Sequence, residues 1–401
     1  MSLYIEVASY FPTLREPWRC SFLSDQVNAI RRNSDYEILV INPESAESYV
    51  IHNTRVIGFK QIKAGRWLCP WLIDWYNKRL MWSAIKKSGV KIENVSVIHG
   101  HLAPCAPYVL ELGKRFKTAK KLLQFHDPDP YGMLLGSGRL AWLKRIVYFC
   151  YYRCCSEQMD CLVAISENVA KVAKEAPYQT VFNNYKPMNE AIKFFSRFPF
   201  RRPRIKKLYV LHNGVDGEIF KPRSSKTDRP AMEFVIGCTA VYRDWKDQIT
   251  LLKAIESLKD KIQGLRLKLV GTRHSGSMYG DCKKFIDEKG LPVEFYESIP
   301  HEKLQDFYRS LDLFVLPSFF EGFGCVFAEA YACGTPFITC EGQGMDDFII
   351  EDERDIWLCK QQNYEDLAAK ILKFYKSKPH QSLSKNVNID ILIKDFLDNI
   401  R

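Results

Sequence analysis

Short β-rich runs alternate with amphipathic stretches along the chain, and this alternation constrains the fold more than any other feature of the sequence. Residues 3–10 (LYIEVASY) predict a strand, residues 22–32 (FLSDQVNAIRR) a helix, and residues 36–42 (YEILVIN) a second strand. Three later runs also predict strands, and each ends in polar residues: VSVIHGH, KKLLQFHD and CLVAISE. Such alternation is typical of α/β proteins with doubly wound parallel sheets, which bind ligands at the carboxyl ends of their strands.

A second series of the same kind follows the stretch VLHNGVDGEIFKP. Strands are predicted for EFVIGCTAV, RLKLVGT and LDLFVLPS, and helices for KDQITLLKAIESLKD, PHEKLQDFYRS and GCVFAEAYACG. A chain of 401 residues is too long for one typical core. We therefore predict two Rossmann-like domains, at residues 1–212 and 213–385, with an amphipathic helix in the remaining residues 386–401.

The composition limits the class of protein and of partner. Hydrophobic residues make up 46% and charged residues 26%, as in ordinary globular proteins. The net charge of +11 favours an anionic partner, and nucleotide phosphates, an acidic membrane surface and nucleic acid all qualify. The first residues, MSLYIEVASYFPT, lack the basic start of a signal peptide, and no apolar run is long enough to span a bilayer.

The cysteines predict a reduced, cytoplasmic protein without a metal centre. The sequence has thirteen, scattered and without a CxxC pair, which suits free thiols. Cys150, Cys154, Cys155 and Cys161 cluster, but no histidine lies near them, so buried packing is the expected role.

Residues 193–207 (KFFSRFPFRRPRIKK) interrupt the alternation with seven basic residues, no acidic residue and four phenylalanines. A solvated loop, a nucleic-acid contact and a membrane-facing patch are all compatible with this composition. Four exposed phenylalanines would be unusual in a plain loop, so we favour peripheral contact with an anionic membrane. The residues expected in this patch are Phe194, Phe195, Arg197, Phe198, Phe200, Arg201, Arg202 and Arg204.

Residues 318–337 (SFFEGFGCVFAEAYACGTPF) combine two glutamates with a glycine turn that leads from a predicted strand into a helix. The free N–H groups at a helix N-terminus suit a phosphate, and glycines let the backbone approach a ligand closely. A carboxylate that accepts from vicinal hydroxyls is a common way to hold a ribose. We interpret Glu321 as a contact for a sugar and Glu329 as a contact for a ribose, with a diphosphate between them. The alternative is that Glu321 caps the helix and Glu329 lies on a solvated face.

In this setting the sequence resembles the retaining GT-B glycosyltransferases of family 4. The resemblance is strongest over residues 205–375, where NGVDGEIFKP, VGT, IPHEKLQDFYRSLDLFVLPSFFEGFGCVFAEAYACGTPFI and YEDLAAKI follow the family pattern in order. The first half matches more loosely, through SYFPT, VIHGHLA, FHDPD and LVAISENV. The resemblance implies two domains across a cleft, with the nucleotide-sugar donor on the second, the acceptor on the first, and the last helix crossing back onto the first.

The resemblance also implies roles for single residues. Lys246 would neutralise the donor diphosphate, and His126 would lie near the reacting sugar, so these two and Glu321 form the expected catalytic set. Donor contacts are expected from Lys246, Glu321 and nine further positions: Arg243, Thr272, Arg273, Ile299, Gly322, Phe323, Gly324, Cys325 and Glu329. Acceptor contacts are expected from His101, His126 and Asp127. His99 is a further residue at the same strand end as His101.

Two parts of the family pattern are missing. Ala240 and Val241 stand where the family has an arginine before its lysine, so Arg243 would have to replace it. REPWRCSF stands where the family has a glycine-rich loop after the first strand, and Arg15 or Arg19 are candidates for the phosphate contacts there.

The reaction that the resemblance implies is front-face transfer of a sugar from a nucleoside diphosphate sugar to a glycan or lipid-linked acceptor, without a cofactor or a metal ion. Cell-surface polysaccharide or lipopolysaccharide assembly is the expected context, with the enzyme cytoplasmic or at the inner face of the membrane. A phosphorylase, or a nucleotide-sugar hydrolase or epimerase, could use the same site. A non-catalytic sugar-nucleotide-binding partner is the alternative outside enzymes, and a nucleic-acid binder would explain the charge but not the paired glutamates.

Overall fold

The computed structural model describes residues 2–16, 20–63, 68–136, 138, 140–178, 184–222, 233–273 and 277–400. The chain forms two compact units. Unit 1 comprises Met1–Asn213 together with Ile389–Arg401, and unit 2 comprises Gly214–Asn388.

Unit 1 is built on an eight-stranded sheet with the order β3-β4-β2-β1-β5-β6-β7-β8. All neighbours are parallel except the β3–β4 hairpin. The strands are β1 (Ser2–Ala8), β2 (Tyr36–Asn42), β3 (Tyr49–Ile51), β4 (Thr54–Gly58), β5 (Val95–His101), β6 (Lys120–Phe125), β7 (Cys161–Ala164) and β8 (Leu208–Val210). The central strands are buried along nearly their whole length because helices cover both faces of the sheet.

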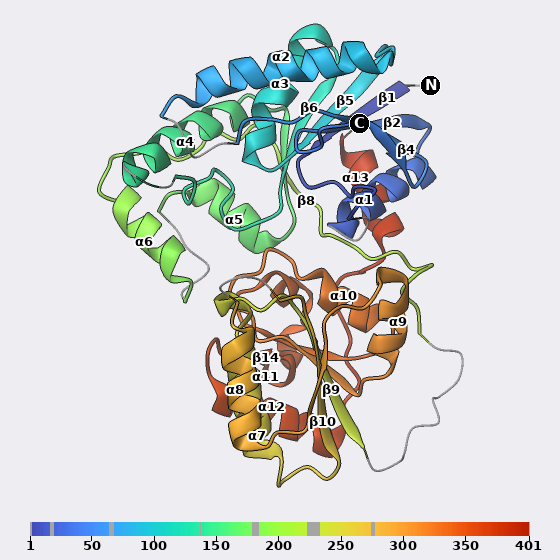
Figure 1. Cartoon of the computed structure of the whole chain (residues 1–401), viewed down its shortest axis with the longest axis vertical. Helices are drawn as coiled ribbons and strands as arrows, with labels where there is room; N and C mark the ends of the chain where they lie inside the picture. The colour runs from blue at the N-terminus through green and yellow to red at the C-terminus, as the bar shows by residue number, and fades with distance from the viewer. Residues whose placement is uncertain are drawn as a thin grey trace. The chain divides into compact units, whose positions relative to one another are not determined.

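The helices of unit 1 include the last helix of the chain. They are α1 (Ser21–Arg32), α2 (Pro70–Ser88), α3 (Ala106–Arg115), α4 (Ala141–Ser156), α5 (Glu167–Glu175), α6 (Lys186–Phe195) and α13 (Ile389–Ile400), with a 3₁₀ turn at Ala103–Cys105. Figure 1 shows α13, in red, beside α1, in blue. Ile393 and Phe396 of α13 are buried, and Arg32 of α1 forms an ion pair with Asp390 at 2.9 Å.

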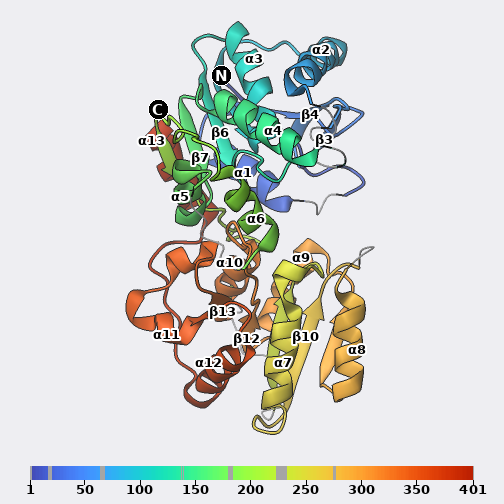
Figure 2. The same cartoon turned by 90° about the vertical axis from the view of Figure 1, so that its left-hand side faces the viewer.

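Unit 2 is built on a parallel six-stranded sheet with the order β11-β10-β9-β12-β13-β14. The strands are β9 (Phe234–Thr239), β10 (Leu265–Val270), β11 (Val293–Tyr296), β12 (Leu313–Val315), β13 (Phe337–Cys340) and β14 (Leu358–Cys359). The helices are α7 (Gln248–Leu258), α8 (Tyr279–Lys289), α9 (His301–Arg309), α10 (Cys325–Ala332), α11 (Arg354–Trp357) and α12 (Tyr364–Ser377), with 3₁₀ turns at Asp244–Lys246, Gly344–Phe348 and Glu351–Glu353. Helix α7 packs against both α8 and α12 (Figure 2).

The strands and helices predicted from the sequence are confirmed, with ends that differ by a few residues. Residues 36–42 form β2 as expected, and the predicted helix at residues 22–32 is α1, which begins at Ser21. The eight-residue α10 is apolar apart from Glu329 and is buried on most sides, as expected for a helix without a polar face. All thirteen cysteines are free.

Candidate functional site

The sheet of unit 2 has a switch point between β9 and β12. From β9 the chain continues to β10 and β11 on one side, and it then returns to form β12 on the other side. The loops after two neighbouring parallel strands diverge at such a point and leave room for a ligand. Lys246 follows β9 and Glu321 follows β12, so the sheet order brings together two residues that are 75 positions apart.

Lys246 and Glu321 form an ion pair at this switch point. The Lys246 ammonium donates to Oε1 of Glu321, and the two side chains are only 18% and 11% exposed. The backbone N–H of Glu321 donates to Oε1 of Gln343 at 2.7 Å, so the loop after β13 fixes the turn that carries the glutamate. Gln343 was not among the predicted site residues, because no strand was predicted at β13 and a lone glutamine in a loop carries no signal.

The turn before α10 is held in a backbone conformation that requires glycine. Gly324 has a φ of 88°, and a Cβ there would lie 2.7 Å from the ring of Phe327. Gly344 lies so close to this turn that a Cβ on it would be 2.3 Å from the carbonyl oxygen of Gly322. Phe323 is buried against Phe348, and α10 begins at Cys325. The turn therefore presents backbone, and no bulky side chain, at the start of a buried helix.

The remaining expected donor contacts lie in loops at the same edge of the sheet. Arg243 lies just before Lys246, with its guanidinium 5.8 Å from the ring of Trp245. Thr272 and Arg273 follow β10, and the Arg273 guanidinium lies 4.2 Å from the ring of Tyr279. Half-buried Ile299 follows β11.

Glu329 lies inside unit 2. It is 8% exposed, and its Oε2 accepts a hydrogen bond of 2.6 Å from the hydroxyl of Tyr308 in α9. Burial raises the pKa of Glu329 to about 7, although the Tyr308 hydrogen bond opposes this shift. The expected alternative of a solvated Glu329 is therefore wrong.

This raised pKa gives Glu329 a predictable effect on stability. Between the unfolded pKa of 4.5 and the folded pKa of about 7, the folded chain holds a proton that the unfolded chain releases. Stability therefore falls as the pH rises through this window, by about 3 kcal/mol in total. Glu329→Gln, which cannot ionise, should become more stable relative to wild type by about that amount between pH 4.5 and pH 8.

Urea unfolding of both proteins at the two pH values measures this effect. Glu365→Gln on α12 is the control, because it removes an exposed carboxylate of the same unit. Parallel pH profiles for wild type and Glu329→Gln would contradict the raised pKa.

Unit 1 has its own switch point, between β1 and β5, and a cavity of about 270 Å³ lies at the carboxyl ends of its strands. Its lining includes Ser9 after β1, Leu102 after β5, and Asp127 and Asp129 after β6. Burial, together with neighbouring Asp129, raises the pKa of Asp127 to about 7. The carboxyl oxygens of Asp129 accept hydrogen bonds from the backbone N–H groups of Met133 and Leu134. Oδ1 of Asp127 accepts a hydrogen bond from the N–H of Asp129.

A hydrogen-bonded chain of side chains links β1, β5 and the end of β6. Oε2 of Glu6 lies 2.5 Å from Nε2 of His101, and Nδ1 of His101 lies 2.7 Å from Nε2 of His126. Glu6 and His101 are buried, and the rings of His101 and His126 are stacked with centroids 5.0 Å apart. Both ring nitrogens of His101 are thus used within the protein, and in this structure His101 supports His126 and offers no nitrogen to a ligand.

This chain fixes the hydrogen positions on His126. The Glu6 carboxylate accepts from Nε2–H of His101, which leaves Nδ1 of His101 as an acceptor for Nε2–H of His126. Burial and the neighbouring His101 lower the pKa of His126, so its ring is neutral and Nδ1 is an acceptor. Among the described residues, His126 Nδ1 has no hydrogen-bond partner. The atom is closed to solvent in this structure, so a ligand would reach it only after a local movement, and such a ligand must donate, as a sugar hydroxyl does.

Glu6, His99 and His101 also place one ligand atom each within 4.8 Å of one another, a grouping that a metal ion could use. Two ligands of a tetrahedral ion lie about 3.3 Å apart, given bonds of about 2.0 Å. The 2.5 Å between Glu6 and His101 fits a hydrogen bond and not a shared ion. The absence of a metal from the reaction stays a prediction. Sequence reasoning missed Glu6, because a lone glutamate in a predicted strand carries no signal.

The basic and aromatic segment 193–207 differs from its expected form. Phe195 is fully buried, Phe194 and Phe200 are half-buried, and only Phe198 is exposed. The expectation of four exposed phenylalanines was therefore wrong, because Phe149 of α4 packs against the rings of Phe195 and Phe200.

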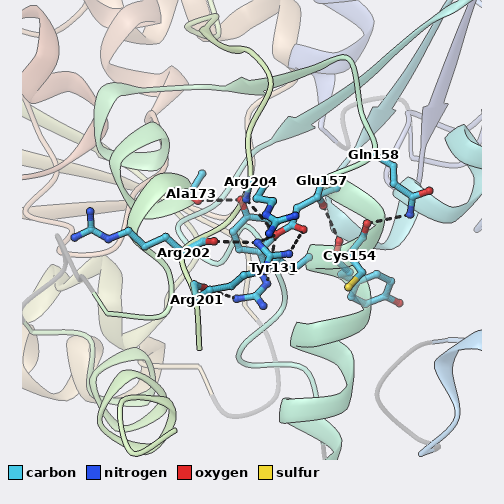
Figure 3. Close-up of polar contacts among 11 residues, drawn as sticks. Tyr131, Cys154, Glu157, Gln158, Ala173, Arg201, Arg202 and Arg204 are labelled. Atoms are coloured by element: carbon cyan, nitrogen blue, oxygen red, sulfur yellow. Dashed lines mark hydrogen bonds and ion pairs between the residues drawn. The ribbon is translucent and has the colours of Figure 1, made fainter. Parts of the chain in front are cut away.

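Several of the arginines in this segment are paired with acidic residues, while Arg197 is exposed. Arg201 and the backbone of Arg204 bind Glu157 (Figure 3), and Arg202 forms an ion pair with Glu175 at 2.9 Å. The segment thus presents fewer free cations than its sequence suggests. Of the candidates for the missing phosphate loop, Arg15 is exposed in a turn after β1, and Arg19 lies outside the described residues.

Comparison with known proteins covers the second half of the chain by sequence and all of it by fold. Residues 220–388 match the family described as glycosyl transferases group 1. A D-inositol 3-phosphate glycosyltransferase of Mycolicibacterium smegmatis is 31% identical over 148 residues, which are 35% of this chain and 33% of that protein. The matched segments cover only 38% and 33% of the length of the first two curated relatives.

Two solved structures resemble the whole chain. Sucrose-phosphate synthase from Thermosynechococcus elongatus aligns with a TM-score of 0.71 at 17% identity, over 100% of this chain and 98% of that one. HepE from Anabaena, crystallised with UDP, aligns with a TM-score of 0.67 at 14% identity, over 100% and 99%. Residues 220–388 therefore match the glycosyl transferases group 1 family, and the chain has the fold of GT-B glycosyltransferases, with two parallel-sheet α/β domains.

Proposed function

We propose that this protein is a retaining glycosyltransferase that moves a sugar from a nucleoside diphosphate sugar to a glycan or lipid-linked acceptor. The observation that carries the proposal is the Lys246–Glu321 pair beside a glycine turn at the switch point of unit 2. A cation and a carboxylate beside a turn whose glycines allow close approach to the backbone are features that suit a diphosphate and an attached sugar. The complexes of HepE with UDP, and with UDP and glucose, support a nucleotide ligand on this fold.

In this proposal the ligand replaces the ion pair. The ammonium of Lys246 turns to the diphosphate, and the carboxylate of Glu321 accepts from hydroxyls of the donor sugar. As the bond between sugar and phosphate breaks, negative charge grows on the leaving diphosphate, where Lys246 and the N-terminus of α10 stabilise it. The departing phosphate oxygen takes the proton of the acceptor hydroxyl on the same face of the sugar. Glu329 holds the ribose from below the surface.

Unit 1 supplies the other substrate contacts. Asp127 contacts the acceptor in the cavity beside β1 and β5. A sugar hydroxyl that reaches Nδ1 of His126, which is closed to solvent in this structure, donates to it. The proposed context is the assembly of cell-surface polysaccharide or lipopolysaccharide, at the cytoplasmic face of an anionic membrane. Among the described residues, no helix has both the length and the apolar character needed to cross a bilayer.

Thermal unfolding with UDP-, GDP-, ADP- and dTDP-sugars tests the donor site. A ligand at 100 times its dissociation constant adds about 2.7 kcal/mol, or about 5–10 °C for a unit of this size. One nucleotide class should stabilise wild type and the control Glu365→Ala, and this shift should shrink or vanish in Glu329→Ala. If no nucleotide stabilises the wild type, the proposal fails. Release of nucleotide at full rate without any acceptor would favour a hydrolase.

A further inference from the structure

Four large apolar side chains in the first two turns of helix α2 are exposed to solvent. Trp71, Leu72, Trp75 and Tyr76 are 56%, 60%, 51% and 46% exposed. They lie at spacings of three and four residues and so form one stripe along the first two turns. The opposite side of the same turns is polar and buried, with Asp74 at 5% and Asn77 at 1% exposure. This is the reverse of the pattern in a helix that covers a core.

The contacts of the buried side show that α2 cannot simply be rotated. Oδ1 of Asn77 accepts from the N–H of Ile62 at 2.9 Å, and its Nδ2 donates to the carbonyl of Ile62 at 3.0 Å. Met81 and Ile85 continue the same face into the core. Rotation of the helix to bury the aromatic stripe would break both hydrogen bonds of the Asn77 amide and would expose Met81 and Ile85.

The exposed side of α2 carries one sign of charge. Arg79, Lys86 and Lys87 continue the stripe toward the end of the helix, and the Arg79 guanidinium lies 3.9 Å from the ring of Trp75. The only acidic residue of α2 is the buried Asp74.

Helix α4 packs against α2, and both helices belong to unit 1 (Figure 1). Apolar residues at the start of α4 are also exposed. Leu140, Trp142 and Leu143 are 60%, 39% and 46% exposed, and they are followed by Lys144 and Arg145. The first turns of both helices thus expose apolar side chains close to cations.

We propose that the exposed side of α2, here called the α2 face, rests on an anionic lipid bilayer; it consists of Trp71, Leu72, Trp75, Tyr76, Arg79, Lys86 and Lys87. Tryptophan and tyrosine beside cations suit the boundary between acyl chains and anionic headgroups. A second copy of the chain would bring the same cations together, and α2 exposes no carboxylate to pair with them.

This inference gives the proposed membrane contact a place other than residues 193–207, whose phenylalanines are largely buried and several of whose arginines are paired. It concerns lipid binding alone. If the protein does not bind vesicles, the proposed sugar transfer is unaffected. If no nucleotide sugar stabilises the protein, the proposed lipid binding of the α2 face is unaffected.

Flotation with vesicles of phosphatidylcholine, with and without phosphatidylglycerol, tests the inference. Wild type should float with the anionic vesicles, and the double variant Trp75→Glu/Tyr76→Glu should bind them at least tenfold more weakly. Arg79→Glu/Lys86→Glu should weaken binding by about fivefold or more per residue at low salt, and less at high salt. The control is Tyr364→Glu, which changes an aromatic side chain that is 37% exposed on α12.

A second comparison separates the α2 face from the earlier patch. Arg197→Glu/Phe198→Glu should bind vesicles like wild type, and thermal unfolding should show that all these variants are folded. The inference is overturned if wild type does not float, or if the Arg197→Glu/Phe198→Glu variant alone loses binding. It is also overturned if sedimentation shows a dimer that Trp75→Glu/Tyr76→Glu dissociates, because the face would then belong to a second copy.

Discussion

Lys246→Ala should lower kcat for sugar transfer by about 10²–10³-fold, the cost of removing one preorganised charge from a developing anion. The reason is that the Lys246 ammonium is the cation fixed beside Glu321 at the switch point of unit 2. The charge on the leaving diphosphate grows only as the sugar bond breaks, so the loss should appear in kcat more than in KM. Release of nucleoside diphosphate, with the donor that passes the thermal test, measures both constants.

Three further variants test whether the effect is specific to Lys246 and its partner. Lys253→Ala removes an exposed lysine on the following helix, α7, and should leave kcat unchanged. Glu321→Gln should also reduce kcat, and Lys246→Ala/Glu321→Gln should lose less than the sum of the two single losses, because each residue orients the other. A kcat for Lys246→Ala within threefold of wild type would remove Lys246 from the catalytic set.

The strand–turn–helix unit that carries Glu321 and Glu329 could be predicted from sequence because it is local. Glu321, the glycine turn and Glu329 lie within one strand–turn–helix unit. The apolar run before the turn, the glycines in it and the apolar run after it are consecutive in sequence and indicate this unit. The burial of Glu329 was not visible, because it depends on Tyr308 of α9, a contact that only the packing of α9 on α10 creates.

The support for His126 and the direction of α2 depend on tertiary structure. Glu6 reaches His101 only because β1 pairs with β5, and the strand order cannot be read from the sequence. For α2, both sides of the helix carry mixed residues, so periodicity alone does not tell which side is buried. The composition of residues 193–207 suggested an exposed patch. In the structure, however, Phe149 packs against Phe195, and Glu157 forms an ion pair with Arg201.

Glu6→Gln should lower kcat by about 10–100-fold although Glu6 is buried, by analogy with the carboxylates that orient metal-binding histidines. A carboxylate can only accept, and it therefore sets the hydrogens of His101 and His126. An amide can donate to His101 Nε2, and Nδ1–H of His101 would then donate to His126. His126 Nδ1 would become a donor and lose its match to a sugar hydroxyl.

The ¹⁵N shifts of the His126 ring report this tautomer directly and separate a positioning role from a merely structural one. We expect wild type to show the Nε2–H tautomer of His126 and Glu6→Gln to show a larger share of Nδ1–H. Gln26, which exchanges amide hydrogen bonds with Gln124 beside this chain, offers a control: Gln26→Glu changes a buried polar group without touching the path from Glu6 to His126. If Glu6→Gln leaves both the ring shifts and kcat unchanged, the hydrogen-bonded chain does not control His126, and its three side chains are then only part of the polar core of unit 1.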